Sequence, residues 1–234
     1  MQLLLIRHGE SVNNLVYRDS GGELDGLVAD PQLTDLGQRQ AAKLAAFFAA
    51  GRLPLPTVLY SSLMRRAVET AAPLADVLDM PVQGWIDLHE VAVDSDGPAG
   101  ATQPDPGLPA SQLKQLCPSL VVPEGADEAG WYHADFETPL VAWQRAQRVA
   151  QAIMLGPYDE DAVVAVVAHG WFCQYLLRSF TVHPPYEDGW LQSWWRMYNT
   201  STILLEYPGH FPGEAADVQW VNRFDHLDDD ELTV

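Results

Sequence analysis

The fold class of this chain is decided by one uncharged stretch, Ala162-Val163-Val164-Ala165-Val166-Val167-Ala168-His169-Gly170-Trp171-Phe172-Cys173-Gln174-Tyr175-Leu176-Leu177. Its first half is a short apolar run rich in β-branched valine, which is typical of a strand. Its second half changes to the longer period of a helix, which we expect to run from Gly170 to near Phe180. The stretch falls short of the ~18 residues needed to span a membrane. It therefore predicts a strand followed directly by a helix.

The same alternation of strand and helix patterns extends over most of the chain. Further strand signals lie at residues 2–6, 57–60, 80–85, 201–207 and, more weakly, 218–221. One helix is expected after the N-cap Thr34, and a second after Ser61-Ser62. Thr138-Pro139 reads as the N-cap and first residue of a third, running to about Leu155. The expected core faces of the first two are Ala41, Leu44, Ala45 and Phe48, and Ala67, Ala71, Leu74 and Leu78. This order predicts an α/β protein: a three-layer α/β/α sandwich with a mostly parallel central sheet.

One region interrupts the alternation. Residues 94–109 hold four prolines and three glycines, and a short helix-like piece and another loop follow as far as Pro139. We interpret 1–234 as a single domain with an insertion at about 91–138, because this segment lacks the apolar residues for its own core. A surface excursion is the simpler interpretation, and a cap or lid facing a substrate is the functional one, since long loops in compact domains are often functional.

Composition excludes several classes of function. The chain has 13 basic and 32 acidic residues, a net charge of −19, which disfavours binding to nucleic acid or to anionic membranes. Hydrophobic residues make up 47%, which excludes intrinsic disorder. The two cysteines, Cys117 and Cys173, read as reduced thiols, and Cys173 as a buried one. The apolar run at residues 3–6 is too short for a signal peptide. We expect a soluble, cytoplasmic protein.

Polar side chains follow four of the expected strands, at the point where each strand ends. They are Arg7-His8-Gly9, Ser61-Ser62 with Arg65 and Arg66, Asp87-Leu88-His89-Glu90, and His169-Gly170. In open α/β sheets ligands bind at the carboxyl ends of the strands. A neutral imidazole is a nucleophile, and arginines and helix N-termini bind tetrahedral anions. A carboxylic acid can protonate a leaving oxygen, and glycine lets the backbone approach a ligand. Together these groups suit phosphoryl transfer through a phosphohistidine.

Five motifs, in order along the chain, carry a resemblance to a known family. They are Leu5-Ile6-Arg7-His8-Gly9-Glu10-Ser11 with Asn14, Leu33-Thr34-Asp35-Leu36-Gly37-Gln38-Arg39-Gln40-Ala41, Ser61-Ser62-Leu63-Met64-Arg65-Arg66-Ala67 with Thr70-Ala71, Asp87-Leu88-His89-Glu90, and Val167-Ala168-His169-Gly170. The chain resembles the histidine phosphatase superfamily, also called the phosphoglycerate mutase-like family. The resemblance covers nearly the whole chain and weakens between Val91 and Thr138.

The resemblance implies a role for each matching residue. His8 would be the phosphorylated nucleophile, with Arg7, Arg66 and His169 completing the phosphate pocket and Glu90 as the proton donor. Asn14 and Ser62 would contact the substrate, as would the backbone at Gly9 and Gly170. Arg65 falls outside the motif. No metal and no cofactor is implied.

Simpler interpretations exist for each of these residues. The two histidines could be core residues with satisfied hydrogen bonds, and Glu90 a surface carboxylate. Arg66 could be a solvated helix residue, but it lies off the expected apolar stripe and in the first turn, where a cation opposes the helix dipole.

The remaining histidines and tryptophans give weaker signals. His89 reads as incidental, whereas His133 could line the pocket. His183, His210 and His226 read as structural or exposed, and the acidic residues around His226 as a solvated tail rather than a metal site. Trp190 and Trp194-Trp195 read as core or interface aromatics, with a lipophilic leaving-group pocket as the alternative.

The expected activity is that of a phosphomonoesterase of the histidine acid phosphatase type, acting on a small-molecule phosphate ester. Phosphoglycerate mutases of the family bind a second anionic group through lysines and arginines that follow the acid glutamate. Here residues 91–141 contain one basic residue, Lys114. Mutase chemistry, or a regulatory module that only binds phosphate, stays as an alternative. Assembly of identical copies is also left open, as is the choice among sugar phosphate, nucleotide, phospholipid headgroup and phosphoprotein.

Overall fold

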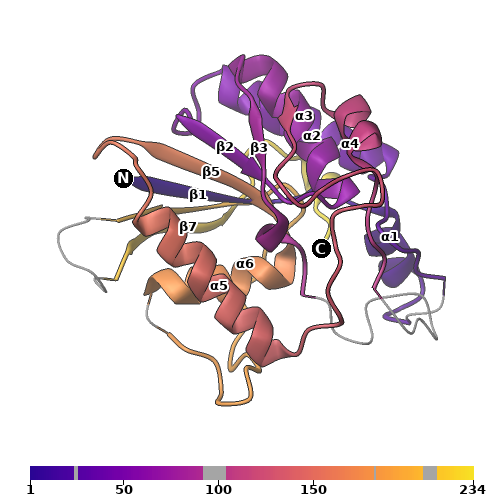
Figure 1. Cartoon of the computed structure of the whole chain (residues 1–234). Helices are drawn as coiled ribbons and strands as arrows, with labels where there is room; N and C mark the ends of the chain where they lie inside the picture. The colour runs from indigo at the N-terminus through magenta and orange to yellow at the C-terminus, as the bar shows by residue number, and fades with distance from the viewer. Residues whose placement is uncertain (24–25, 92–103, 182, 208–214) are drawn as a thin grey trace.

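The computed structural model describes residues 1–23, 26–91, 104–181, 183–207 and 215–234 (Figure 1). Over these residues the strands are β1 Gln2–Arg7, β2 Val58–Ser61, β3 Val82–Gly84, β4 Leu120–Val121, β5 Val163–Ala168, β6 Thr202–Glu206 and β7 Asp217–Arg223. The helices are α1 Val12–Asp19, α2 Asp35–Ala49, α3 Arg65–Leu78, α4 Ala110–Leu116, α5 Pro139–Met154 and α6 Gly170–Thr181, with short 3₁₀ turns η1 Ile86–Leu88 and η2 Asp229–Glu231.

The described strands form one sheet in the order β4-β3-β2-β5-β1-β6-β7. The five strands from β4 to β1 run parallel, while β6 and β7 are antiparallel to their neighbours. The central pair, β1 and β5, is in register with Leu5 opposite Val166. The expected mostly parallel sheet is therefore confirmed, with an antiparallel edge.

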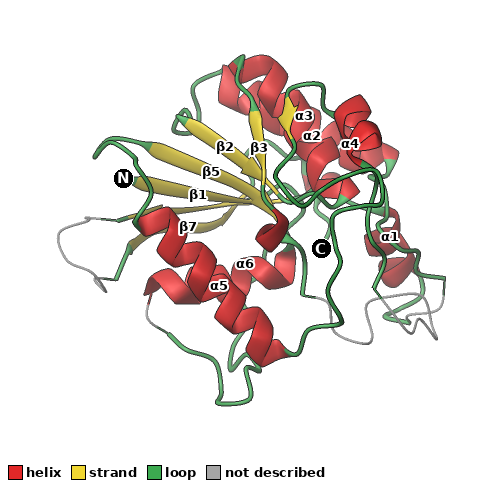
Figure 2. Cartoon of the chain, viewed as in Figure 1, coloured by secondary structure: helices red, strands yellow, loops and turns green. Residues whose placement is uncertain are grey.

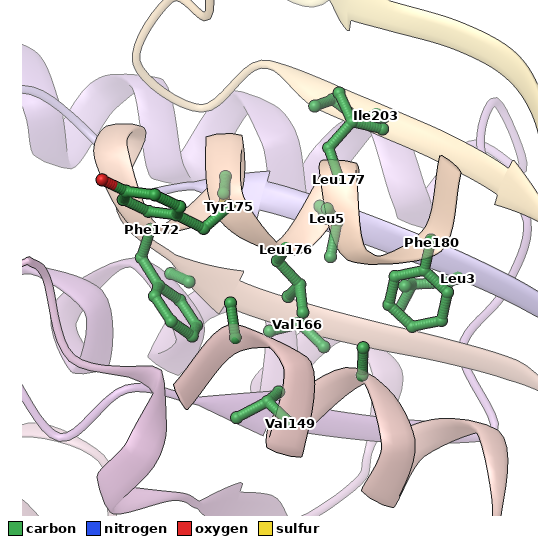
Figure 3. Close-up of a cluster of buried hydrophobic side chains, with 14 of the residues drawn as sticks. Leu3, Leu5, Val149, Val166, Phe172, Tyr175, Leu176, Leu177, Phe180 and Ile203 are labelled. Atoms are coloured by element: carbon green, nitrogen blue, oxygen red, sulfur yellow. The ribbon is translucent and has the colours of Figure 1, made fainter. Parts of the chain in front are cut away.

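Helices cover both faces of this sheet (Figure 2). Because side chains alternate along a strand, Leu3 and Leu5 of β1 face one core while Leu4 and Ile6 face the other. The first core packs against α5 and α6, where Phe172 and its neighbours fill the space between helix and sheet (Figure 3). The second packs against α2 and α3. The three-layer α/β/α sandwich expected from the sequence is thus confirmed.

Two elements have no counterpart among the expected ones. β4 is only two residues long, too short for a periodic pattern. α1 has apolar residues at Val12, Leu15 and Val16, but none of its residues is fully buried, and a stripe of three residues is too short to predict a helix by itself. Its start is marked instead by a capping box, in which the Ser11 side chain accepts from Asn14 N and the Asn14 side chain accepts from Ser11 N. The expected helix starts at Thr34 and Thr138 are both present, each with the threonine oxygen accepting a helix N–H.

The described part of the insertion packs onto the main body of the molecule. The expected loop at 94–109 lies largely outside the described residues, which resume at Pro104. Beyond it, Leu113, Cys117, Leu120 and Trp131 join the core on the α2/α3 side. β4 pairs with β3 and extends the sheet. The described part of the insertion thus shares a core with α2 and α3.

Both cysteines are free thiols, and Cys173 is buried as expected; Cys117 is buried as well. Burial raises the pKa of the Cys117 and Cys173 thiols. No described helix combines the length and the apolar character required to cross a bilayer.

Candidate active site

The carboxyl ends of β1, β2 and β5 bring the predicted residues together. His8 N donates to Ala168 O at 3.0 Å, and Ser62 N donates to Val167 O at 3.0 Å, so the first residues beyond the strands are still held by the sheet. The His8 and His169 rings consequently lie with their centroids 5.2 Å apart. The two histidines are 161 positions apart in the chain, but both are buried and lie side by side at the carboxyl end of the sheet.

The hydrogen bonds of His8 define which ring nitrogen is the nucleophile. Nδ1 lies 2.7 Å from Gly9 O, which can only accept, so we assign the proton to Nδ1. Nε2 accepts from Arg66 Nε at 3.2 Å, as a lone pair would. Burial, followed by the charges of Arg66 and Arg7, lowers the pKa of His8 well below its usual range. The ring is therefore neutral at neutral pH and presents the lone pair of Nε2.

His169 is also neutral, because burial and then the Arg66 charge lower its pKa well below the usual range. Its Nε2 lies 2.8 Å from Ser62 Oγ, so the Ser62 hydroxyl orients the ring. Because Ser62 Oγ accepts from Met64 N at 3.2 Å, we assign its hydroxyl proton to the bond with Nε2 and the ring proton of His169 to Nδ1. Its Nδ1 is fully buried and has no hydrogen-bond partner among the described residues. A buried polar atom without a partner costs about 1–3 kcal/mol, and a ligand that bonds to it removes that cost.

Arg7 supplies a second donor of this kind. One of its terminal nitrogens donates to Met197 O, while its buried Nε has no partner among the residues described. Burial lowers the pKa of Arg7 to about 10, and the nearby Glu90 acts in the opposite direction, so the guanidinium stays charged at neutral pH. A side chain on Gly170 would begin 3.2 Å from Arg7 Nε, so glycine keeps this space open.

Two buried guanidinium groups and two neutral imidazoles thus lie next to one another, and two of their nitrogens, Arg7 Nε and His169 Nδ1, have no hydrogen-bond partner within the described ranges. Arg66 lies in the first turn of α3 and is 8% exposed, so it is not a solvated helix residue. Its charge opposes the helix dipole at this N-terminus, and a nearby anion, such as the buried Asp30 carboxyl or a bound ligand, offsets it. The arrangement can bind a tetrahedral anion and place it against His8 Nε2.

Glu90 lies at the N-terminus of α6, after the 3₁₀ turn that follows β3. Its Oε1 accepts from Phe172 N at 2.8 Å and from Val91 N at 2.9 Å, and its Oε2 accepts from Trp171 N at 3.2 Å. Oε1 accepts two hydrogen bonds and Oε2 accepts one. The remaining lone pair of Oε2 is therefore the place where the carboxyl can carry a proton. The half-buried carboxyl is therefore fixed in direction and is not a free surface group.

Asn14 and Gly9, both predicted to contact the substrate, also make contacts that hold the loop after β1 in place. Besides capping α1, Asn14 Oδ1 accepts from Asn199 Nδ2 at 3.3 Å, and the same Nδ2 donates to His8 O at 3.0 Å. A side chain on Gly9 would begin 2.6 Å from Gly37 O, so glycine is needed here for packing against α2. The sequence interpretation had assigned that glycine to a sharp turn of the backbone and to ligand approach, not to packing against a helix.

Two residues next to the site were missed from the sequence. Asn199 lies in a loop between α6 and β6 and holds the His8 carbonyl, and no local pattern marks it. Arg145 on α5 donates to the backbone of the Glu90 loop. Its signal was available: it is a charge within the apolar stripe Ala142, Ala146, Val149 of that helix.

Several weaker expectations need correction. His89 is buried against Tyr132, with its pKa lowered by burial to about 3, so it is not incidental. His133 is exposed, and His210 lies outside the described residues. The acidic tail is solvated only in part, because Glu231 and Thr233 are buried.

Of the tryptophans near the C-terminus, Trp195 packs on the core as expected, but Trp190 and Trp194 are not core residues, because about half of each is exposed. Trp195 packs under Arg178, whereas the half-exposed Trp190 and Trp194 contact Trp171. No cluster of metal-ligating side chains occurs within the described ranges.

The fold and site define an α/β protein with a histidine–arginine anion site at the carboxyl ends of its parallel strands. The chain matches the model of the histidine phosphatase superfamily (branch 1) over residues 3–214. It belongs to this family.

Individual relatives agree with this assignment. The chain is 29% identical to a glucosyl-3-phosphoglycerate phosphatase of Mycolicibacterium vanbaalenii, over 94% of this chain and 91% of that one. It is 42% identical to a 2,3-bisphosphoglycerate-dependent phosphoglycerate mutase of Mycobacterium tuberculosis, over 38% of this chain and 34% of the relative. The solved structure of a mycobacterial glucosyl-3-phosphoglycerate phosphatase superposes with a TM-score of 0.63 at 21% identity, covering 94% of this chain and 98% of the other.

Proposed function

We propose that this chain hydrolyses phosphate monoesters of small molecules through a covalent phosphoryl group on His8. The observation that carries the proposal is the buried, neutral His8, whose Nε2 lone pair faces Arg66. Two donors of the same site, Arg7 Nε and His169 Nδ1, have no partner in the part of the chain that the structure describes. Membership of the family and the phosphatase relative that spans most of the chain support it.

In the first step the ester phosphate binds next to His8 Nε2, where the Arg66 guanidinium also lies. Nε2 attacks phosphorus as the bond from phosphorus to the ester oxygen breaks. Glu90 Oε2 gives its proton to that leaving oxygen. Arg7, Arg66 and His169 donate to the transferring oxygens, where charge accumulates in the transition state. The Nδ1–H bond to Gly9 O supports the positive charge that the phosphorylated ring acquires.

In the second step water cleaves the phosphohistidine. Glu90, now ionised, takes a proton from the attacking water, whose oxygen forms the new bond to phosphorus. The bond from phosphorus to Nε2 breaks, its electron pair returns to the ring, and inorganic phosphate leaves. Every role is filled by a protein side chain, so we propose an activity of the histidine acid phosphatase type that needs no metal.

Hydrolysis is favoured over mutase chemistry by the charge of the segment after Glu90. A bisphosphorylated or carboxylated substrate needs cationic side chains beyond the phosphate pocket. Residues 91–141 contain a single lysine or arginine, Lys114. That lysine is exposed on α4. The mutase relative matches just over a third of this chain.

The test is a phosphate-release screen across sugar phosphates, glucosyl-3-phosphoglycerate, nucleotides, phospholipid headgroups and phosphopeptides, with EDTA present. We expect turnover by the wild type and an acid-labile, base-stable phosphoryl group on the trapped protein. His8→Ala should abolish both. Full activity of His8→Ala would overturn the proposal, transfer of phosphate without release would identify a mutase, and an activity restored only by divalent ions would contradict the metal-free scheme.

A further inference from the structure

Arg145 is a buried cation that does not contact the phosphate pocket in the described structure. It is 3% exposed and occupies a core position of α5, beside Ala142 and Ala146. Its Nη1 donates to Asp87 O at 2.6 Å and to His89 O at 2.9 Å, and its Nη2 lies 3.5 Å from Glu90 O. One guanidinium group thus holds three carbonyls of the loop that carries the proposed acid.

The opposite edge of the same guanidinium binds the insertion. Arg145 Nε donates to Glu137 Oε2 at 3.1 Å, and Nη2 forms an ion pair with Glu137 Oε1. Glu137 is itself buried, at the end of the insertion where the chain enters α5. The neighbouring Tyr132 packs edge-on against His89, with ring centroids 4.8 Å apart. The last part of the insertion is therefore attached to the Glu90 loop at two places.

Arg145 also supports the other side of the Glu90 carboxyl. Its guanidinium carbon lies 4.2 Å from the centroid of the Phe172 ring. The backbone N–H of Phe172 is the donor to Glu90 Oε1. Hence Arg145 contacts both the loop that carries Glu90 and the residue whose N–H orients its side chain.

A buried ion pair is a weak source of stability, since well-packed apolar side chains of similar size often stabilise as much. The planar fork of arginine, by contrast, fixes the direction of several acceptors at once. We propose that Arg145 is a positioning residue for Glu90. Because Arg145 also pairs with Glu137, the orientation of the Glu90 carboxyl then depends on how the insertion packs. This inference rests on the proposed acid and base role of Glu90.

The decisive variant is Arg145→Lys, which keeps a charge for Glu137 but lacks the planar fork. A displacement of the acid by about 1 Å can cost about 10²-fold. We therefore expect kcat on an alkyl phosphate to fall about 10–10²-fold. Phosphohistidine formation from p-nitrophenyl phosphate should change less than about threefold, because that leaving group needs little protonation.

A double-mutant cycle with Glu90→Gln distinguishes positioning from general support of the fold. If Arg145 acts through Glu90, Arg145→Lys has little further effect on the alkyl phosphate once Glu90 is glutamine. Equal losses on both substrates, or losses that add to those of Glu90→Gln, would overturn the inference. Arg148→Lys makes the same change at an exposed position of α5 and should leave both rates unaltered.

Should Arg145→Lys fail to fold, Glu137→Gln tests the same link from the insertion side. It should reproduce the selective loss on alkyl phosphates, and an unchanged ratio of the two rates would contradict the inference. The wild type is assayed first. If the wild type turns over but the variants show no selective loss on alkyl phosphates, the positioning role of Arg145 is wrong and the proposed function stands. If the wild type forms no phosphohistidine, the proposed function itself is wrong.

Discussion

At the scale of single residues, the arginines of the site act on the histidines as well as on a bound anion. The charges of Arg66 and Arg7 add to burial in lowering the pKa of His8. They keep the ring unprotonated and hence nucleophilic while attracting the phosphate that it attacks. A lysine-lined pocket would lack the planar donor fork that matches phosphate oxygens. The nucleophile and its anion site therefore depend on the same two side chains.

The two adjacent arginines at the start of α3 should differ sharply in their effect on rate. Arg66 is buried against His8, whereas Arg65 is partly exposed and pairs with Glu69 at 2.8 Å. Arg66→Ala should lower kcat/KM by about 10³-fold or more, and Arg65→Ala should have little effect. Steady-state kinetics of both variants on one substrate checks this. Equal losses in the two variants would mean that Arg66 is not the arginine that faces the phosphate.

Glu90→Gln should separate the two half-reactions. Glutamine can neither protonate a leaving oxygen nor accept a proton from water, so the rate on alkyl phosphates should fall about 10²–10⁴-fold. With p-nitrophenyl phosphate the first step should be nearly spared, and phosphoenzyme should accumulate with a burst of nitrophenol. Rapid-quench kinetics measures the burst. Equal slowing of both substrates without a burst would leave Glu90 without the dual role.

At the scale of elements, the loop after β1 is held against the start of α2 by two glycines in direct contact. A side chain on Gly37 would begin 2.1 Å from Glu10 O, a backbone atom two residues beyond His8. Gly9 meets Gly37 from the other side. The approach of helix to strand, and hence the placement of His8, depends on both residues lacking a Cβ.

Gly37→Ala should therefore destabilise the protein and impair the site together. Inserting atoms into a packed place usually costs about 1–3 kcal/mol, and the displaced backbone here carries His8. We expect lower free energy of unfolding in urea and a lower kcat. Gln38→Ala, at an exposed position of the same helix, is the matched control. A Gly37→Ala variant with wild-type kcat would show that the contact does not position His8.

At the scale of the whole molecule, several histidines are buried in neutral form. Burial lowers the pKa of His89 to about 3 and that of His226 to about 4, and it lowers those of His8 and His169 as well. In the unfolded chain their pKa is near 6.5. Below that pH the unfolded state binds protons that the folded state does not, so stability decreases as the pH falls.

Urea unfolding at about pH 7 and at about pH 5 should therefore show a clear loss of stability at the lower pH, up to about 1.4 kcal/mol per pH unit for each such histidine. Asp30, whose pKa burial raises to about 6, acts in the opposite direction, but it is one group against four. His226→Gln should weaken the dependence by one group, and exposed His183→Gln should not. Equal or greater stability at about pH 5 would refute the linkage.

Much of the fold was accessible from the sequence because its signals are local. The stripe of α2, the capped starts at Thr34 and Thr138, and the change of period after Ala168 each lie within a few residues. Elements with too short a pattern were missed: α1, whose apolar stripe has three residues, and β4, which is two residues long. Most of the site residues could be proposed for the same reason, since they belong to short motifs that begin where a strand ends.

What the sequence by itself determined was the layered α/β architecture and the identity of the groups at the strand ends, because periodicity and short motifs are written in neighbouring residues. Only the tertiary structure decided their chemical state and their support. His8 is neutral because residues 58 and 161 positions away bury it and charge its surroundings. The supports from Asn199 and Arg145 likewise reach across long separations in the chain. Burial and long-range hydrogen bonds exist only once the chain has folded. A local pattern can mark Arg145 as a charge within an apolar stripe, but it does not encode which distant groups Arg145 or Asn199 will bind.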